Sequence, residues 1–471
     1  MAEIDKANEI KEIKETKEIK EIEEKEENDD LEDNEKIPIN INIRDIKESI
    51  KIKENAEIEE IEENEKEINE NSDEEKKSLL SIDSTDPNQL NPDVCSEKEK
   101  ISDANRAFRE IFITTFAQFM GYAALFALQA ELKKKYDINE GTTKSHIFGF
   151  AVSFLYIGNL LFRLGHNVVF ALFKPRDRVL ISITSMSCSM IILFFTISAN
   201  SIPSMAWVFI AYILGGIGIG TFEANMLRVA TPFGPKTKAW CLYGIPPGIV
   251  MITIGSFLLM QVGVHVKWIY LSVLCFLVFG LILYLIRIYR RASRIETISA
   301  KEFIKFFRKF PRKIWEPKVR PYALTMMVNM FSVSLFSPGV ILYIFGKNDI
   351  FFSGTSTKMA YHLFVTIYDA GFFIGDLGGR KLIYRSKKNY HPAFFLILNI
   401  IGIGFGVSHL SELAITAGIF IALGNGIIYS LSCRNIDEKI DRKYNLIGLS
   451  YWLFVGDIGS VIGSNLISFI S

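Results

Sequence analysis

The feature that most constrains this chain is a series of eleven apolar runs between residues 112 and 470. About 20 apolar residues cross a bilayer core of about 30 Å as a helix, and a spanning backbone must satisfy its hydrogen bonds internally. The sequence therefore predicts an all-α polytopic membrane protein with about 11 transmembrane helices. The second run is long enough that a re-entrant bend stays open as an alternative. The predicted spans are residues 112–131, 147–173, 179–198, 205–226, 239–262, 268–289, 322–346, 359–379, 392–409, 412–432 and 446–470.

The Lys and Arg residues between these runs are concentrated in alternate gaps. The opposite gaps hold few of them, mainly Lys133–Lys135 and Lys144. Because cationic loops remain on the cytosolic side, the pattern predicts a cytosolic amino end and a luminal or extracellular carboxyl end. The main cationic positions are Lys174, Arg176, Arg178, Arg228, Lys236, Lys238, the segment 287–320, Arg380–Lys388 and Arg434–Lys443.

The amino-terminal segment differs in composition from the rest of the chain. Residues 1–100 contain 16 basic and 35 acidic side chains and no aromatic ones, whereas residues 101–471 contain 37 basic and 18 acidic ones. Such a segment buries too little apolar area to offset the entropy of ordering, and it lacks the apolar stretch of a signal peptide. We expect residues 1–105 to form a disordered acidic cytosolic tail; a transient acidic helix is the alternative.

One segment of this tail fits an acidic-dileucine sorting pattern. Glu75 is separated by three residues from the pair Leu79 and Leu80. An adaptor protein can bind such a linear motif only when the segment is extended and exposed, as in a disordered tail. The motif predicts an endosomal, lysosomal or vacuolar membrane, with a chance match in a Glu-rich segment as the alternative and the plasma membrane also open.

The apolar runs fall into two groups around a basic segment. We expect residues 106–289 to form a six-helix bundle and residues 322–471 a five-helix bundle. Aromatic residues recur at helical spacing between Phe303 and Trp315, so residues 290–321 are predicted to be a basic amphipathic linker on the cytosolic leaflet and not a nucleic-acid site. This layout resembles the major facilitator superfamily, in which two bundles move about a site near the bilayer midplane.

Ionisable side chains inside the predicted spans are candidates for function because their insertion costs at least a few kcal/mol each. Asp369 has no cation of its own helix within reach, so we expect it to line a cavity. Asp376 and Arg380 stand at i, i+4, a spacing that brings side chains together, and are predicted to form a structural ion pair.

The other buried ionisable groups are predicted to line the same cavity. Glu223 and Asp457 are acidic, and Arg163 and His166 could supply the opposite charge. Arg163 could instead extend to the membrane interface, and His166 could be a hydrogen-bonded packing residue. Uncharged hydrogen-bonding groups are added by Asn159, Asn425 and Tyr429.

These groups suit a small polar solute and leave proton coupling open. The five cysteines have no CxxC spacing, so neither a disulfide framework nor a metal site is predicted. The sequence contains no phosphate-binding loop and no nucleophile–base motif. We therefore expect no enzyme activity, no cofactor, and the lipid bilayer and a small solute as partners.

Several short stretches resemble the battenin family of endolysosomal membrane proteins, which are related to the major facilitators. They lie, in order, at residues 174–182, 216–222, 368–373, 429–436 and 457–459. The resemblance implies a role in lysosomal pH and in handling basic amino acids or glycerophosphodiesters. Ile219 stands where that family has a glutamate, and Glu223, one turn later, could take its place.

The carboxyl half also resembles the equilibrative nucleoside transporters. The matching elements are SVSLFSPGV at residues 332–340, the spacing of Asp376, Gly379 and Arg380, and the GNG of residues 424–426. This resemblance implies the same fold with nucleosides or nucleobases as solutes. A third alternative, from another class, is a membrane scaffold without transport activity that recruits partners through its acidic tail.

Overall fold

The structure is a computed structural model that describes residues 109–139, 142–294, 315, 318–346, 350–351, 358–386, 388–440 and 444–470. These residues belong to one compact unit. The predicted acidic tail, with Glu75, Leu79 and Leu80, and most of the predicted amphipathic linker lie outside the described residues.

The first half of the described chain is a set of apolar helices joined by short turns. Pro175 and Pro235 occupy the first position of α7 and α9, where the missing N–H of proline costs nothing. The elements are α4 (Glu110–Ala127), α5 (Gln129–Lys135), α6 (Thr143–Val169), α7 (Pro175–Ser198), α8 (Ala206–Ala230), η2 (Thr231–Phe233), α9 (Pro235–Tyr243), α10 (Ile245–Thr253), α11 (Gly255–Gln261), α12 (Val266–Leu283), η3 (Tyr284–Tyr289) and η4 (Arg291–Arg294).

The second half of the described chain is also built mainly of apolar helices. A π-helical turn, η6, interrupts its first span at the segment that contains Pro338, and a proline cannot donate the regular helical hydrogen bond. The elements are α14 (Arg320–Ser334), η6 (Leu335–Val340), α15 (Ile341–Gly346), the antiparallel pair β1 (Ile350–Phe351) and β2 (Lys358–Met359), α16 (Tyr361–Arg385), η7 (Pro392–Phe395), α17 (Leu396–Gly406), α18 (Ser411–Lys439) and α19 (Asn445–Ile470).

The all-α polytopic fold predicted from the sequence is confirmed. Each predicted run coincides with helical elements, and eight helical segments of the described chain are long and apolar enough to cross a membrane. The other three runs differ for physical reasons. The helix α16 contains Asp369, Asp376 and Arg380, η6 divides the span that begins with α14, and η7 with α17 forms a shorter apolar helix, Pro392–Gly406. The re-entrant bend left open in the second run is absent, because α6 is continuous over 27 residues.

Glycine rows bring particular helices into close contact. A Cβ atom on Gly216 of α8 would lie 2.8 Å from the backbone oxygen of Leu155 on α6, and one on Gly220 would lie 2.6 Å from that of Asn159. In the second half, a Cβ on Gly379 of α16 would lie 2.6 Å from the backbone oxygen of Leu423 on α18. Small residues at such spacing allow the backbones of membrane helices to approach.

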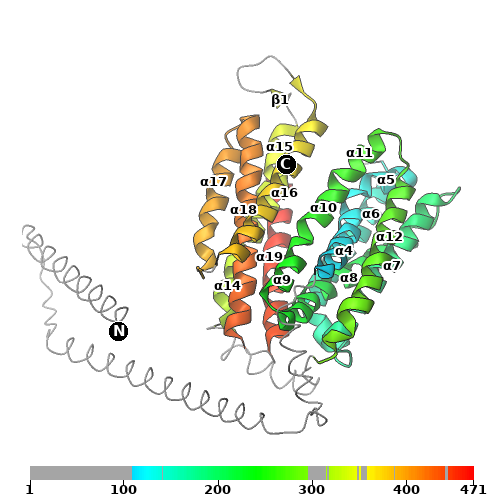
Figure 1. The fold of residues 1–471 in the computed structure, drawn as a ribbon. Coiled ribbons are helices and arrows are strands. Elements are labelled where there is room, and N and C mark those ends of the chain that lie inside the picture. The colour runs from blue at the N-terminus through cyan, green and yellow to red at the C-terminus, as the bar shows by residue number, and fades with distance from the viewer. Residues whose placement is uncertain are drawn as a thin grey trace, which may run out of the picture. The chain divides into compact units, whose positions relative to one another are not determined.

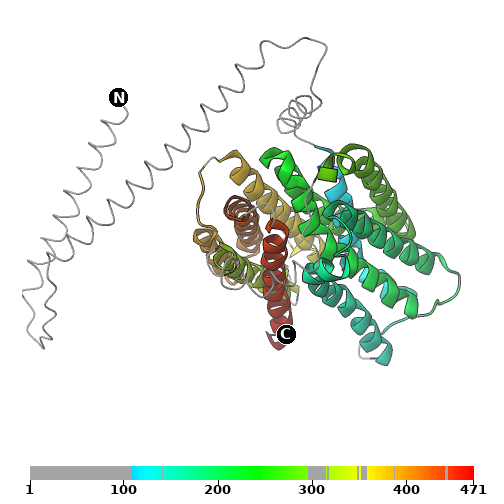
Figure 2. The same ribbon diagram turned by 90° about the horizontal axis from the view of Figure 1, so that it is seen from below.

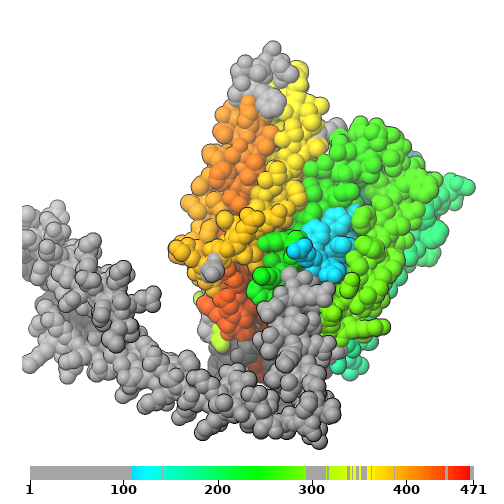
Figure 3. Space-filling model, viewed as in Figure 1, coloured from blue at the N-terminus to red at the C-terminus, as the bar shows by residue number. Residues whose placement is uncertain are grey.

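The two halves meet along a seam between α16 and α19 of the second half and α6, α8, α9 and α10 of the first. Figure 1 shows the first half in cyan and green beside the second half in yellow to red. Seen from below, the two groups of helices stand next to each other (Figure 2), and on the surface α16 borders the green helices of the first half (Figure 3). We call the lower end of this seam in Figure 1 the α9 end and the upper end the α11 end.

Candidate functional site

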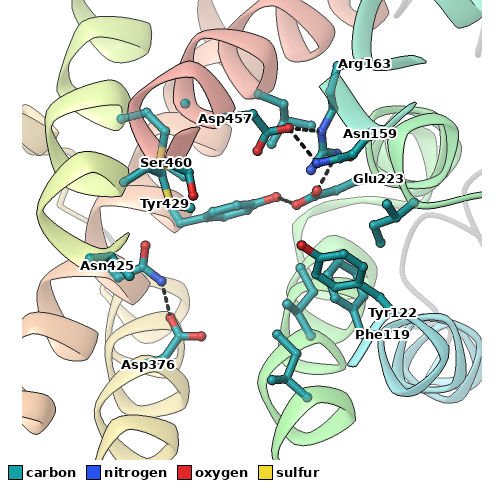
Figure 4. A pocket seen from close by; sticks show the side chains of 18 of the residues that line it. Phe119, Tyr122, Asn159, Arg163, Glu223, Asp376, Asn425, Tyr429, Asp457 and Ser460 are labelled. Atoms are coloured by element: carbon teal, nitrogen blue, oxygen red, sulfur yellow. Dashed lines mark hydrogen bonds and ion pairs between the residues drawn. The ribbon is translucent and has the colours of Figure 1, made fainter. Parts of the chain in front are cut away.

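A cavity of about 260 Å³ lies in the seam, and both halves contribute to its wall. Figure 4 shows polar side chains from α6, α8, α16, α18 and α19 converging on it. The ionisable residues and amides that line it are Asn159, Arg163, Glu223, Asp376, Arg380, Asn425 and Asp457, and its aromatic residues are Phe119, Tyr122, Tyr156, Phe372 and Tyr429.

Arg163 of α6 joins the two halves at this cavity. Its Nη1 lies 2.5 Å from Oε2 of Glu223 on α8, and its Nε donates to Oδ2 of Asp457 on α19 at 2.7 Å. Asn159, one turn earlier on α6, donates to the same Asp457 oxygen at 3.1 Å. One buried guanidinium therefore faces two carboxylates, one from each half of the protein.

A second contact between the halves runs through Tyr429 of α18. Its hydroxyl donates to Oε1 of Glu223, so this carboxylate binds Arg163 with one oxygen and Tyr429 with the other. The guanidinium carbon of Arg380 lies 4.5 Å from the centroid of the Tyr429 ring, a distance at which a cation and an aromatic ring attract each other. Tyr429 thus contacts both charged pairs of the site.

The second charged pair belongs to α16 alone. Arg380 Nε lies 3.2 Å from both carboxylate oxygens of Asp376, which is the i, i+4 pairing expected from the sequence. Asp376 also accepts a hydrogen bond from Asn425 Nδ2 at 3.1 Å.

A row of amides extends this second pair into the core of the second half. Asn329 Nδ2 donates to Asn425 Oδ1 at 2.8 Å, and Asn399 Nδ2 donates to Asn329 Oδ1 at 3.0 Å. The amides orient one another, because Asn425 Oδ1 accepts from Asn329 and Asn329 Oδ1 accepts from Asn399. They thereby fix the position of the Asp376 carboxylate.

A second cavity, of about 490 Å³, contains Asp369. Its wall includes Tyr122, Tyr156, Phe372 and Asp376, which also line the first cavity, so the two cavities are neighbours. Asp369 precedes Asp376 by two turns on α16, and it therefore lies closer to the α11 end. The predicted site residues are thus divided between two adjoining cavities.

The seam is closed toward the α9 end by further polar contacts. Lys238 of α9 is buried and contacts Asp437 of α18, whose other oxygen accepts from Asn445 at 2.8 Å. Asn167 of α6 donates to the Ser450 hydroxyl of α19 at 3.2 Å. These contacts tie the two halves together beyond the Arg163 network.

The structure changes the interpretation of three predicted residues. His166 does not line either cavity: it is fully buried, and its Nδ1 lies 2.7 Å from the backbone oxygen of Phe162, one turn earlier on α6. Asp376 and Arg380 form their ion pair but also face the first cavity, because α16 runs along the seam.

Sequence reasoning missed the aromatic wall and the closure at the α9 end. Tyr122 and Tyr156 lie in ordinary apolar runs, where tyrosine gives no signal of a cavity. Lys238 and Asp437 stand 199 positions apart in sequence. Only the cationic character of their loops was visible.

Comparisons with known proteins establish the fold. No protein-family model and no curated protein matches the sequence. A structure of the E. coli fucose:proton symporter FucP is similar, with a TM-score of 0.58 and 13% sequence identity, over 76% of this chain and 91% of that one. A structure of FucP in an outward conformation has a TM-score of 0.56 and 13% sequence identity, over 76% of this chain and 91% of that one. The proton:xylose symporter XylE bound to 6-bromo-6-deoxy-D-glucose has a TM-score of 0.56 and 12% sequence identity, over 77% of this chain and 88% of that one.

The chain is therefore a multi-pass membrane protein with the fold of the major facilitator superfamily. Because the sequence identity to these structures is 12–13%, their similarity to this chain is evidence for the fold alone. The battenin and nucleoside-transporter resemblances concern the solute, and they remain predictions.

Proposed function

We propose that this protein is an alternating-access transporter of a small polar solute. The observation that carries the proposal is the cavity in the seam, where Arg163 of the first half binds Asp457 of the second. Ligand sites in transporters of this architecture lie at the interface between the repeats. A charged contact between two rigid bundles breaks when the bundles tilt apart, so binding at this point is coupled to the movement of the halves.

The contacts along the seam support a conformation in which the two halves are joined at the α9 end. Contacts at the α9 end, among them Lys238 with Asp437, join the two halves on that side of the seam. The second cavity is lined by residues of α10 and by α16 residues from Val365 to Asp376. We propose that the α9 end is cytosolic, because it carries the cationic loops around Arg228, Lys236 and Lys238. In that orientation the solute enters from the lumen or the outside.

Two solute classes follow from the resemblances, and residues of both groups of motifs lie at the cavity. Asp376, Arg380 and Asn425 come from the nucleoside-transporter elements, and Asp457 and Tyr429 come from the battenin elements. Aromatic rings beside hydrogen-bonding groups suit stacking and polar recognition of a small metabolite. Our proposal therefore has two specific forms: a battenin-like endolysosomal carrier of basic amino acids or glycerophosphodiesters, and a carrier of nucleosides or nucleobases.

Uptake by proteoliposomes tests the proposal. Vesicles containing the purified full-length protein are assayed with labelled uridine, adenosine, arginine and glycerophosphocholine, with and without a pH gradient. Uptake of uridine or adenosine alone rejects the battenin form, and uptake of arginine or glycerophosphocholine alone rejects the nucleoside form. Acceleration by a pH gradient supports proton coupling. Failure of Arg163→Ala to reduce uptake contradicts the proposed role of the seam cavity.

The membrane scaffold is the competing proposal, and two variants separate it from transport. A scaffold needs the acidic tail for its partners but not a charged cavity. Deletion of residues 1–100 then abolishes its cellular function, and Asp369→Asn leaves that function intact. The reverse result favours a transporter.

A further inference from the structure

The inference concerns Asp369 and deepens the proposed transport function, on which it rests. Its carboxylate lies on the wall of the second cavity, and it makes no hydrogen bond or ion pair with any residue that the structure describes. The other acidic groups of the two cavities are paired: Asp376 with Arg380, and Glu223 and Asp457 with Arg163. Asp369 is thus the exception among them.

The charges that line the two cavities do not balance. Among the described residues, two arginines face four carboxylates, which are Glu223, Asp369, Asp376 and Asp457. Arg163 binds both Glu223 and Asp457, Arg380 binds Asp376, and neither arginine is in contact with Asp369. An unpaired carboxylate away from bulk water is unfavourable unless a cation approaches it. Two negative charges are therefore uncompensated: one is shared by Glu223 and Asp457 around Arg163, and the other is Asp369 at the second cavity, which has no cation in contact.

The surroundings of Asp369 favour an organic cation over a hydrated metal ion. The wall carries the rings of Tyr122, Phe126, Tyr156, Tyr368, Phe372 and Phe373. Aromatic faces attract ammonium groups and cover their apolar substituents, but they supply none of the several oxygen ligands that hard metal ions require. In the described chain, no group of three His, Cys, Asp or Glu side chains could hold a metal ion.

We propose that Asp369 and the aromatic wall around it form a binding subsite for the ammonium group of a small organic cation. The subsite lies next to the first cavity and shares Tyr122, Tyr156 and Phe372 with it. A solute with a cationic end and a polar body can therefore bind Asp369 with one part and the Arg163 network with the other. The solute selected in this way carries a positive charge.

A matched pair of probes tests this subsite on the purified full-length protein. Choline and 3,3-dimethyl-1-butanol have the same shape and differ by one positive charge. Calorimetric titration is expected to show choline binding at least tenfold more tightly than the neutral alcohol. Asp369→Asn is expected to remove this preference while the thermal unfolding midpoint stays the same.

The control is Asp177→Asn, which removes a carboxylate near the start of α7 that contacts the Tyr289 hydroxyl and lines neither cavity. It should leave choline binding unchanged. Agmatine serves as a second cation with a primary amine. The inference is overturned if neither cation binds better than the neutral alcohol, or if Asp369→Asn leaves the preference intact.

Transport measurements separate this inference from the proposed function. Arg163-dependent uptake of an uncharged solute that is insensitive to Asp369→Asn overturns the cation subsite and leaves the transporter proposal standing. Cation binding without uptake of any solute supports the cation subsite and contradicts the transporter proposal. If Asp369→Asn alters only the pH dependence of uptake and leaves choline binding unchanged, the group carries a proton and the inference is wrong.

Discussion

Arg163 on α6 donates to Asp457 on α19 at 2.7 Å, and this contact joins the two halves of the protein at the cavity in the seam. The same guanidinium lies 2.5 Å from Glu223 of its own half. Separation of the halves would leave Arg163 with Glu223 and expose Asp457. The pairing of one cation with two acids therefore differs between the joined and separated halves, which makes the cluster sensitive to the conformation of the seam.

Removal of Arg163 is expected to destabilise the fold and abolish uptake. Arg163→Leu leaves the buried Glu223 and the partly buried Asp457 close together without their cation, at a cost of about 3–5 kcal/mol. The triple variant Arg163→Leu, Glu223→Gln and Asp457→Asn contains no unpaired charge, so it should regain much of the lost stability but no transport. Unfolding midpoints and uptake by proteoliposomes measure the two effects. If Arg163→Leu were as stable as the parent protein, the stabilising role of the network around Arg163 would be contradicted.

The contact between Lys238 and Asp437 is expected to hold the α9 end closed. Asp437→Asn weakens it, so the seam should open there more often. Two cysteines beside this contact, Cys241 and Cys433, are buried. In a background with Cys95, Cys188 and Cys275 replaced by Ser, we expect a charged thiol reagent to label Asp437→Asn severalfold faster than the same background with Asp437 intact.

Two outcomes test this closure further. The double variant Lys238→Asp with Asp437→Lys restores opposite charges and should bring the labelling rate back down. Equal labelling rates in all three proteins would show that the pair has no part in closing the seam.

Two adjacent glycines of α16 are expected to respond differently to the same substitution. A Cβ at Gly379 would lie 2.6 Å from the Leu423 oxygen, whereas one at Gly378 would meet no atom within 4 Å. Gly379→Ala should therefore cost about 1–3 kcal/mol through overpacking. Gly378→Ala should be neutral or stabilise the helix by up to about 1 kcal/mol. Thermal unfolding of the two variants checks the prediction, and equal effects would refute close packing of α16 on α18.

The sorting motif is expected to direct the protein to endolysosomal or vacuolar membranes. Leu79→Ala with Leu80→Ala should shift a fluorescently tagged chain toward the cell surface, because adaptor recognition needs both leucines. Leu90→Ala, elsewhere in the same acidic segment, is the control. An unchanged distribution of the double variant would mean that the match arises from the Glu-rich composition alone.

Much of the fold was predictable from local patterns. Length and apolarity place α6, α7, α8 and α12 almost as observed, because a membrane helix satisfies its backbone within one segment of the chain. The pairing of Asp376 with Arg380 followed from helical spacing for the same reason. The interruption at η6 was less visible, since a proline marks a break in a span without defining the geometry that replaces the helix.

The candidate site was predictable only as a set of residues. Charge in an apolar run singled out Arg163, Glu223 and Asp457, but it gave His166 equal standing, and the ring of His166 is turned back toward its own helix. Which acid pairs with Arg163, and that Asp369 pairs with none of the described residues, depends on how α6, α16 and α19 are rotated about their axes. Apolarity and length are properties of one segment, so they can be determined directly from the sequence. The partners of a charge belong to several helices at once, and only the packing of the two halves decides them.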